Sequence, residues 1–115
     1  MATNSDCLFC RIASNVIPVT RVYENQAVLA FPDINPQAPV HLLIIPKRHY
    51  SSLAHTPSSD EILGQLLAAA NEVAHRQHLD NGFRLVINTG ADGGQTVDHL
   101  HLHLLGGRQM HWPPG

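Results

Sequence analysis

Helical spacing of apolar residues predicts one long helix in the second half of the chain. Ser58 and Glu61 have the spacing of a capping box, a pair that commonly begins a helix, and the pattern runs to about His78. The turn dipeptide Asn81-Gly82 follows. The residues of the buried face recur three or four positions apart, as one face of a helix requires: Ile62, Leu66, Ala69 and Val73.

Shorter apolar runs predict five strands and one short helix. The run at 40–45 is rich in branched apolar residues and is stopped by Pro46, as expected of a central strand that is buried on both faces. Because runs of strands do not alternate with helices, the pattern predicts an α+β fold with a mostly antiparallel sheet. The expected elements are a helix at 7–15 and strands at 20–24, 26–31, 40–45, 83–88 and 98–105.

The composition fits a single domain, residues 1–115, and excludes several classes of protein. Seven basic and nine acidic residues give a net charge of −2, which argues against nucleic-acid binding, because that depends on clustered Lys and Arg. No apolar run approaches the roughly 18 residues of a membrane span, and the start Met1–Asp6 has no signal-like core, so we expect a cytoplasmic protein without a membrane partner. The chain has nine histidines but one lysine, and this excess of histidine points to catalysis or metal binding, because imidazole titrates near neutral pH and is the commonest metal ligand.

Three of these histidines alternate with leucines in the last predicted strand. Successive side chains of a strand point to opposite faces, so His99, His101 and His103 should share one face while the leucines pack the core. Neighbouring charge and burial both lower the pKa of an imidazole, so at least one ring should be neutral at pH 7. A neutral ring nitrogen is what a nucleophile, a general base or a metal ligand needs.

A glycine-rich loop at 89–96 leads into this strand. We expect the backbone N–H groups of this loop, which includes Gln95, and the hydroxyl of Thr96 to form an anion site of the kind that suits a phosphate. Phosphate donors beside an imidazole suggest attack on phosphorus. A zinc site built on the histidines themselves is the alternative that the spacing leaves open.

The two cysteines, Cys7 and Cys10, are spaced as Cys-x-x-Cys. Two cysteines are too few for a disulfide scaffold, and no strand precedes them as in a thioredoxin-like redox pair. They are either half of a zinc site or two small apolar residues in the N-terminal helix.

The run His99–Leu105 resembles the motif of the histidine triad (HIT) family, in which three histidines alternate with apolar residues. The tail Gly106–Gly115 resembles the end of that family's HINT branch of nucleotide-binding proteins, and the resemblance extends from Cys7 to the last residue. It also includes the segments 31–41, 45–47 and 88–96. The implied fold is a sheet of about five antiparallel strands with one long and one short helix, which pairs with a second copy into a larger sheet.

The resemblance implies a purine nucleoside phosphoramidase or nucleotidyl hydrolase that needs no cofactor for catalysis. His101 matches the nucleophile, which forms a covalent nucleotidyl-histidine intermediate. His103 matches the histidine that contacts the phosphate and helps to protonate the leaving group. His99 matches the histidine that orients the nucleophile, and His41 matches the one that completes the proton relay.

Further positions match the family's contacts with its purine nucleotide ligand. Asp33 matches the carboxylate that takes the ribose hydroxyls, although Pro-Asp-Ile-Asn-Pro is also typical of an Asx turn. Trp112 matches a tail residue, within 106–115, that reaches across a homodimer interface. The phosphate positions are Asn88, Gly94 and Thr96, and the apolar purine slot comprises Phe9, Ile12, Phe31, Ile34 and Leu43.

Some triad proteins carry zinc on two cysteines and two histidines, and the matching residues here are Cys7, Cys10, His49 and His99. Such a set would make an ordinary tetrahedral structural site. The alternative to the hydrolase is therefore a zinc-binding, nucleotide-sensing interaction module with little turnover.

Overall fold

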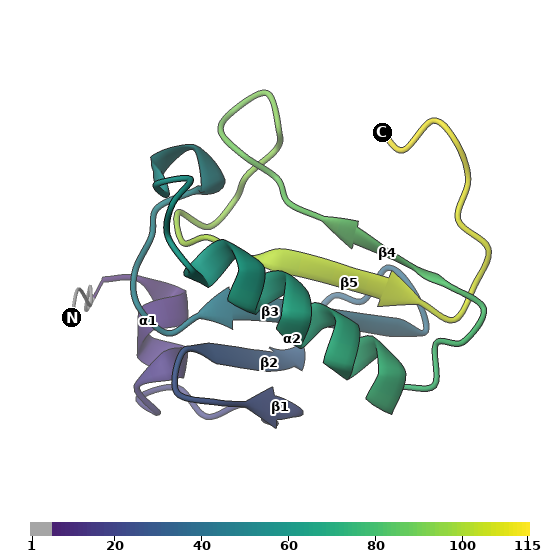
Figure 1. Cartoon of the computed structure of the whole chain (residues 1–115), viewed down its shortest axis with the longest axis horizontal. Coiled ribbons are helices and arrows are strands. Elements are labelled where there is room, and N and C mark those ends of the chain that lie inside the picture. The colour runs from purple at the N-terminus through teal and green to yellow at the C-terminus, as the bar shows by residue number, and fades with distance from the viewer. Residues whose placement is uncertain (1–5) are drawn as a thin grey trace.

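Five antiparallel strands form one sheet in the order β1-β2-β3-β5-β4 in the computed structural model, which describes residues 6–115 (Figure 1). The predicted α+β fold is confirmed. Residues 1–5, which belong to the expected domain and to its polar start, lie outside the described residues. In the described part, no helix has the length and apolar character needed to cross a bilayer. The elements are α1 Leu8–Ala13, β1 Tyr23–Glu24, β2 Val28–Pro32, β3 Val40–Pro46, a short 3-10 helix Leu53–His55, α2 Ile62–Arg76, β4 Phe83–Val86 and β5 Leu102–Gly106.

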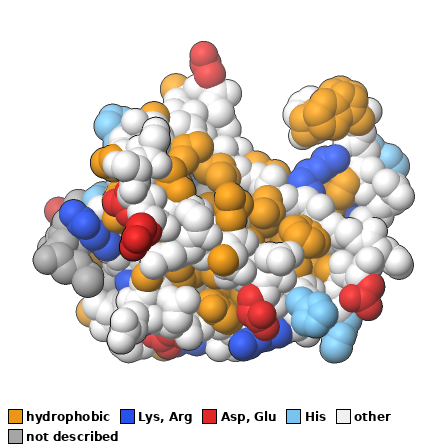
Figure 2. Space-filling model, in the orientation of Figure 1, with side chains coloured by type: hydrophobic (Ala, Val, Ile, Leu, Met, Phe, Trp, Pro, Cys, Tyr) orange, Lys and Arg blue, Asp and Glu red, His pale blue; other side chains and the backbone are white. Residues whose placement is uncertain are grey.

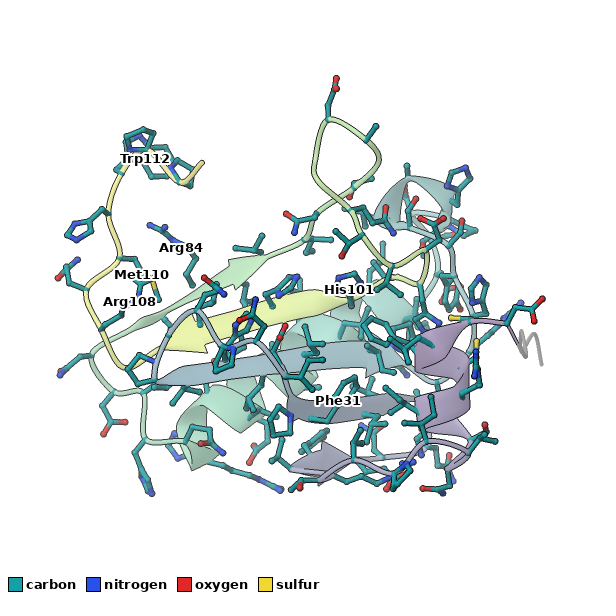
Figure 3. The ribbon with its side chains drawn as sticks, turned by 180° about the vertical axis from the view of Figure 1, so that it is seen from behind. Phe31, Arg84, His101, Arg108, Met110 and Trp112 are labelled. Carbon is teal, nitrogen blue, oxygen red and sulfur yellow. The ribbon has the colours of Figure 1, made fainter. Side chains whose placement is uncertain are left out.

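Strand β3 lies at the centre of the sheet and is buried on both faces, as predicted. Leu42 and Ile44 face the core under α2, while Leu43 and Ile45 face the smaller core under α1. Helix α2 crosses one face of the sheet (Figure 1), and α1 covers only one end of the opposite face (Figure 3). The rest of that opposite face is therefore left for other side chains.

Helix α2 begins differently from the sequence prediction. Oδ1 of Asp60 accepts a hydrogen bond from the N–H of Ile62 at 2.9 Å, whereas Glu61 forms no side-chain cap. The expected capping box of Ser58 and Glu61 is wrong, because the carboxylate of Asp60 accepts the N–H of Ile62, one of the free N–H groups of the first turn. The helix ends at Arg76, near the expected boundary.

Strand β5 begins at Leu102, four residues later than expected. Its ladder with β3 ends where Leu102 faces Ile44, close to Pro46, which has no N–H to donate. The preceding segment is held differently, since the N–H of Leu100 donates to the carbonyl of Tyr50 at 2.7 Å. The alternation of side chains nevertheless continues, with Leu100 in the core under α2 and His99 buried.

The N-terminal helix and the first hairpin are shorter than predicted. Cys7 caps α1 through Sγ, which accepts the N–H of Cys10, and Leu8 is exposed. The hairpin turn is held by Oδ1 of Asn25, which accepts two backbone N–H groups. Only two residues, Tyr23 and Glu24, form β1.

Two glycines should respond in opposite ways to alanine. Gly107 has φ +88°, and a Cβ there would lie 2.9 Å from Cβ of Pro39, whereas a Cβ on the helical Gly64 would meet nothing within 4 Å. We expect Gly107→Ala to lower the free energy of unfolding by about 1–3 kcal/mol, and Gly64→Ala to raise it by about 0.5–1 kcal/mol. Urea denaturation measures both, and equal effects of the two substitutions would contradict this packing.

Candidate functional site

Histidine side chains gather on the face of the sheet that α2 leaves open. The rings of His101 and His103 have centroids 5.1 Å apart, and the ring of Phe9 from α1 lies 5.1 Å from that of His101. In the register of β3 and β5, Leu43 is opposite His103 and His41 is opposite Leu105, so His41 is the diagonal neighbour of His103 on the same face. The predicted shared face is confirmed, and Figure 3 shows His101 near the end covered by α1.

The buried His101 is held in one tautomer. Its Nδ1 lies 2.7 Å from the backbone carbonyl of His99. A carbonyl oxygen only accepts, so the neutral ring carries its proton on Nδ1 and donates it to that oxygen. Nε2 therefore keeps its lone pair, which is the state that a nucleophile requires.

His41 and His103 form a directly bonded pair beside a carboxylate. Nε2 of His41 lies 2.9 Å from Nδ1 of His103, and Oδ2 of Asp33 is 3.4 Å from the former and 3.9 Å from the latter. The other carboxylate oxygen of Asp33 accepts the N–H of Asn35 at 2.8 Å, so the expected Asx turn is present as well. The sequence did not predict that Asp33 would face the histidines.

The direction of the hydrogen bonds in this pair is fixed from outside. The backbone N–H of Gln37 donates to Nδ1 of His41 at 3.0 Å, so Nδ1 is the unprotonated nitrogen and Nε2 carries the proton. That proton is donated to Nδ1 of His103, which leaves the proton of neutral His103 on its own Nε2. A metal ligand needs the reverse arrangement at His41, a bare Nε2 and a protonated Nδ1. The donor at Nδ1 therefore argues against a metal site at Asp33, His41 and His103.

Burial lowers the pKa of His103 below its ordinary value of 6.5, and the positive forms of His101 and His41 lower it further, while Asp33 opposes the shift. The unfolded chain takes up this proton near pH 6.5, so the contribution of His103 to stability is fully present above that pH and is lost as the pH falls from 6.5 through the lower pKa of the folded state. We expect an NMR titration of the His103 ring to have a midpoint below 6.5. A midpoint at or above 6.5 would contradict this picture of the pair.

Cys7, Cys10, His49 and His99 meet at the N-terminus of α1, as the resemblance implied. Their four ligand atoms all lie within 4.8 Å of one another. Nδ1 of His99 is 3.3 Å from Sγ of Cys7 and 3.6 Å from Sγ of Cys10, and Nδ1 of His49 is 3.3 Å from Sγ of Cys10. A sulfur and a nitrogen bound to one tetrahedral zinc ion stand about 3.5 Å apart, so the spacing fits.

The outer contacts of His99 also suit a metal ligand. Its Nε2 donates to the carbonyl of Pro46 at 2.8 Å, which leaves Nδ1 bare and facing the sulfurs. Burial is the main reason that the pKa of His99 falls to about 4, so the ring is neutral at pH 7. This histidine thus joins the Cys/His cluster to the nucleophile, since its side chain faces the cysteines and its carbonyl holds His101.

The glycine-rich loop is less open than expected. The N–H of Gly90 donates to the side-chain oxygen of Gln95, and the N–H of Gln95 donates to the carbonyl of Gly90. The N–H of Gly94 donates to the carbonyl of Ala91. The amide of Gln95 also donates to the carbonyls of Ser51 and Val97. The prediction that this loop offers free backbone N–H groups is wrong for Gly90, Gly94 and Gln95, because these groups donate hydrogen bonds within the loop.

Two side chains next to this loop remain available. Among residues 6–115, no hydrogen bond is formed by the side chain of Asn88 or of Thr96. Thr96 is exposed, and Asn88 is half-buried two residues beyond the end of the edge strand β4. The phosphate-binding role implied for these two positions is therefore compatible with their surroundings.

The apolar residues assigned to the purine slot are found in two settings. Four of them are buried together between α1 and the sheet, with Phe9 and Phe31 in edge contact at 5.8 Å, whereas Ile34 is fully exposed. Trp112 is 83% exposed on the tail and lies away from His101 of its own chain (Figure 3). The buried four are Phe9, Ile12, Phe31 and Leu43.

Comparison with known proteins gives consistent matches over almost the whole chain. A sequence profile described as the HIT domain matches residues 14–110. A HIT-like protein of Synechocystis is 54% identical over 111 residues, which cover 96% of this chain and 97% of its own. A Zea mays protein named 14 kDa zinc-binding protein is 53% identical over 97% of this chain and 90% of its own. The crystal structure of a HIT family hydrolase from Legionella pneumophila has a TM-score of 0.92 at 53% identity, over 95% of this chain and 99% of that one.

Proposed function

Because the chain belongs to the HIT domain family, we propose that it is a nucleotidyl hydrolase, of the adenosine 5′-phosphoramidase type, acting on purine nucleoside monophosphate derivatives. It cleaves a P–N or acyl-phosphate bond through a nucleotidyl-histidine intermediate. The observation that carries this proposal is the fixed tautomer of His101, which leaves Nε2 bare on a ring whose centroid is 5.1 Å from that of His103. A nucleophile next to a proton relay is what an amine leaving group on phosphorus requires.

In the first step, Nε2 of His101 forms a bond to phosphorus while the bond from phosphorus to the amine breaks. The amine leaves with a proton delivered by Nε2 of His103, and the His41–His103 pair takes up one proton from solvent. The negative charges of the bound phosphate and of Asp33 favour the presence of that proton.

In the second step, a water molecule attacks phosphorus and the bond to His101 breaks. The proton of the water returns to solvent through the same pair, so the nucleoside monophosphate is released and the protein is restored. In this proposal Asn88 and Thr96 bind the phosphate, Asp33 the ribose and Ile34 one side of the purine. Asp33 can do so through Oδ2, since Oδ1 is bound to the N–H of Asn35.

We also propose that the Cys/His cluster holds a structural zinc ion, a role supported by the fit of the donor atoms and by the name of the maize relative. Bound zinc would act as a crosslink between α1 and the segments that carry His49 and His99. The proton steps above involve none of the four ligand side chains, so catalysis itself needs no cofactor. Zinc-dependent interaction with little turnover is the competing function.

A homodimer is the assembly that we propose for this protein. Hydrophobic side chains gather on the face that carries α2, over the strip next to the edge strand β4 (Figure 2), and Leu67, Ile87 and Phe83 lie there partly or largely exposed. The exposed Trp112 is suited to contact a second copy rather than its own site. Light scattering should give twice the 12.6 kDa of the chain, and a monomer at micromolar concentration would contradict the proposal.

Turnover of adenosine 5′-phosphoramidate in excess chelator tests the proposed function. Metal-independent hydrolysis to AMP and ammonia is expected. Activity that disappears with the metal and returns with it would indicate metalloenzyme chemistry, and AMP binding without turnover would favour the interaction module.

The net charge of −2 supports small-molecule rather than nucleic-acid partners, and we assign the protein to the cytoplasm.

A further inference from the structure

Arg108 lies outside the histidine cluster but is bonded to the loop that orients it. Its Nε and one terminal nitrogen donate to the carbonyl of Gln37 at 3.3 and 3.1 Å, and its other terminal nitrogen donates to the carbonyl of Gln109. The N–H of the same Gln37 donates to Nδ1 of His41. Four residues, Arg108, Gln37, His41 and His103, thus form a continuous series of contacts from the tail to the proton relay.

The turn after β5 is built to bring Arg108 to this loop. Gly106 is paired with Val40 at the end of the sheet. Gly107 has φ +88° and approaches Pro39 so closely that a Cβ would lie 2.9 Å from that ring. The loop and the turn are therefore in direct contact. This backbone contact brings the Arg108 side chain next to Gln37.

The direction of the hydrogen bond at His41 decides which end of the pair carries a proton. While the N–H of Gln37 faces Nδ1 of His41, the proton between the rings comes from His41 and the remaining proton is on Nε2 of His103. Without that donor, the opposite arrangement becomes accessible: a protonated Nδ1 on His41, a proton from His103 between the rings, and a bare Nε2 on His103. A bare Nε2 cannot donate to a leaving group.

We propose that Arg108 is a positioning residue for the proton relay, which fixes the backbone of Gln37 so that His41 and His103 hold the tautomers that leave Nε2 of His103 able to donate. This inference rests on the proposed function, because it assigns the relay to protonation of a leaving group. Arg108 is exposed, so its replacement removes the contact with Gln37 without opening a cavity.

The effect should depend on how strongly the leaving group needs a proton. Adenosine 5′-phosphoramidate must release an amine, whereas the p-nitrophenyl ester of AMP releases a stable phenolate. We expect Arg108→Ala to lower kcat for the phosphoramidate about tenfold, which is part of the 10²–10⁴-fold that general acid–base catalysis supplies, with little change in KM. The loss on the nitrophenyl ester should be smaller, and Arg108→Lys, which keeps a donor and the charge, should recover part of the difference.

Nitrogen-15 NMR of the histidine rings gives a readout that does not depend on turnover. The wild type should show an unprotonated Nδ1 on His41, and Arg108→Ala a partly protonated one. Arg76→Ala, which removes an exposed arginine of α2 that stands over the ring of Tyr23, is the matched control and should leave rates and tautomers unchanged.

Equal losses on both substrates, or unchanged ring tautomers in Arg108→Ala, would overturn the positioning role. If the wild type hydrolyses neither substrate, the proposed function fails, and the NMR comparison still decides whether Arg108 sets the tautomers. The two failures are therefore distinguishable.

Discussion

Replacing His101 with glycine should abolish the turnover of adenosine 5′-phosphoramidate, while AMP should still bind. Loss of a nucleophile from a group of residues that act together lowers kcat by roughly 10⁴-fold or more. Binding should persist because the phosphate and purine contacts that we propose are made by other residues, among them Thr96 and Ile34. Steady-state kinetics measures the loss, and isothermal titration with AMP measures the binding.

His101 is only 4% exposed, so the glycine variant also leaves a cavity. His101→Asn fills more of that space and should be equally inactive, and thermal unfolding would show whether either variant is folded. Turnover at the wild-type rate by a folded variant would contradict the assignment of His101 as the nucleophile.

Removal of zinc, or replacement of Cys10 by serine, should lower the unfolding temperature of the protein. A ligand present at a hundredfold excess over its Kd stabilises the folded state by about 2.7 kcal/mol, which corresponds to roughly 10 °C in a domain of this size. Zinc content by elemental analysis should fall from about one ion per chain to none, as expected when a ligand of a tetrahedral site is lost. Differential scanning calorimetry, with and without chelator, measures the shift.

Two variants, each lacking one histidine, provide the control for this experiment. His49→Ala removes a ligand whose Nδ1 faces Cys10, whereas His75→Ala removes an exposed histidine from α2. Only the former should lose zinc and respond no further to chelator. Equal zinc content in the two variants would contradict the four-ligand site.

Most of the fold followed from local patterns, because the periods of the apolar residues report burial directly. The central strand at 40–46 and the inward face of α2 are examples. The errors occurred where a tertiary contact replaced a local one. Asp60 displaced the expected capping box at the start of α2, and the contact of Leu100 with Tyr50 replaced the first part of the last predicted strand.

The candidate site was predicted less evenly. Alternation placed the three histidines on one face, and the family resemblance, now confirmed by the profile match, indicated His41 and the zinc ligands. Spacing alone could not show that Asp33 faces the histidine pair, that the N–H of Gln37 sets its tautomers, or that Gln95 holds its own loop. These contacts join segments far apart in the chain or use backbone groups, which leave no side-chain signal in the sequence.

The covalent step is the central claim, and trapping the intermediate tests it most directly. The wild-type protein is mixed with adenosine 5′-phosphoramidate, quenched within one turnover, and analysed by intact-mass and peptide mass spectrometry. We expect one AMP group per chain, attached to His101 and absent from His101→Asn. Product formation in that first turnover without any adduct, or an adduct on another residue, would contradict nucleophilic catalysis by His101.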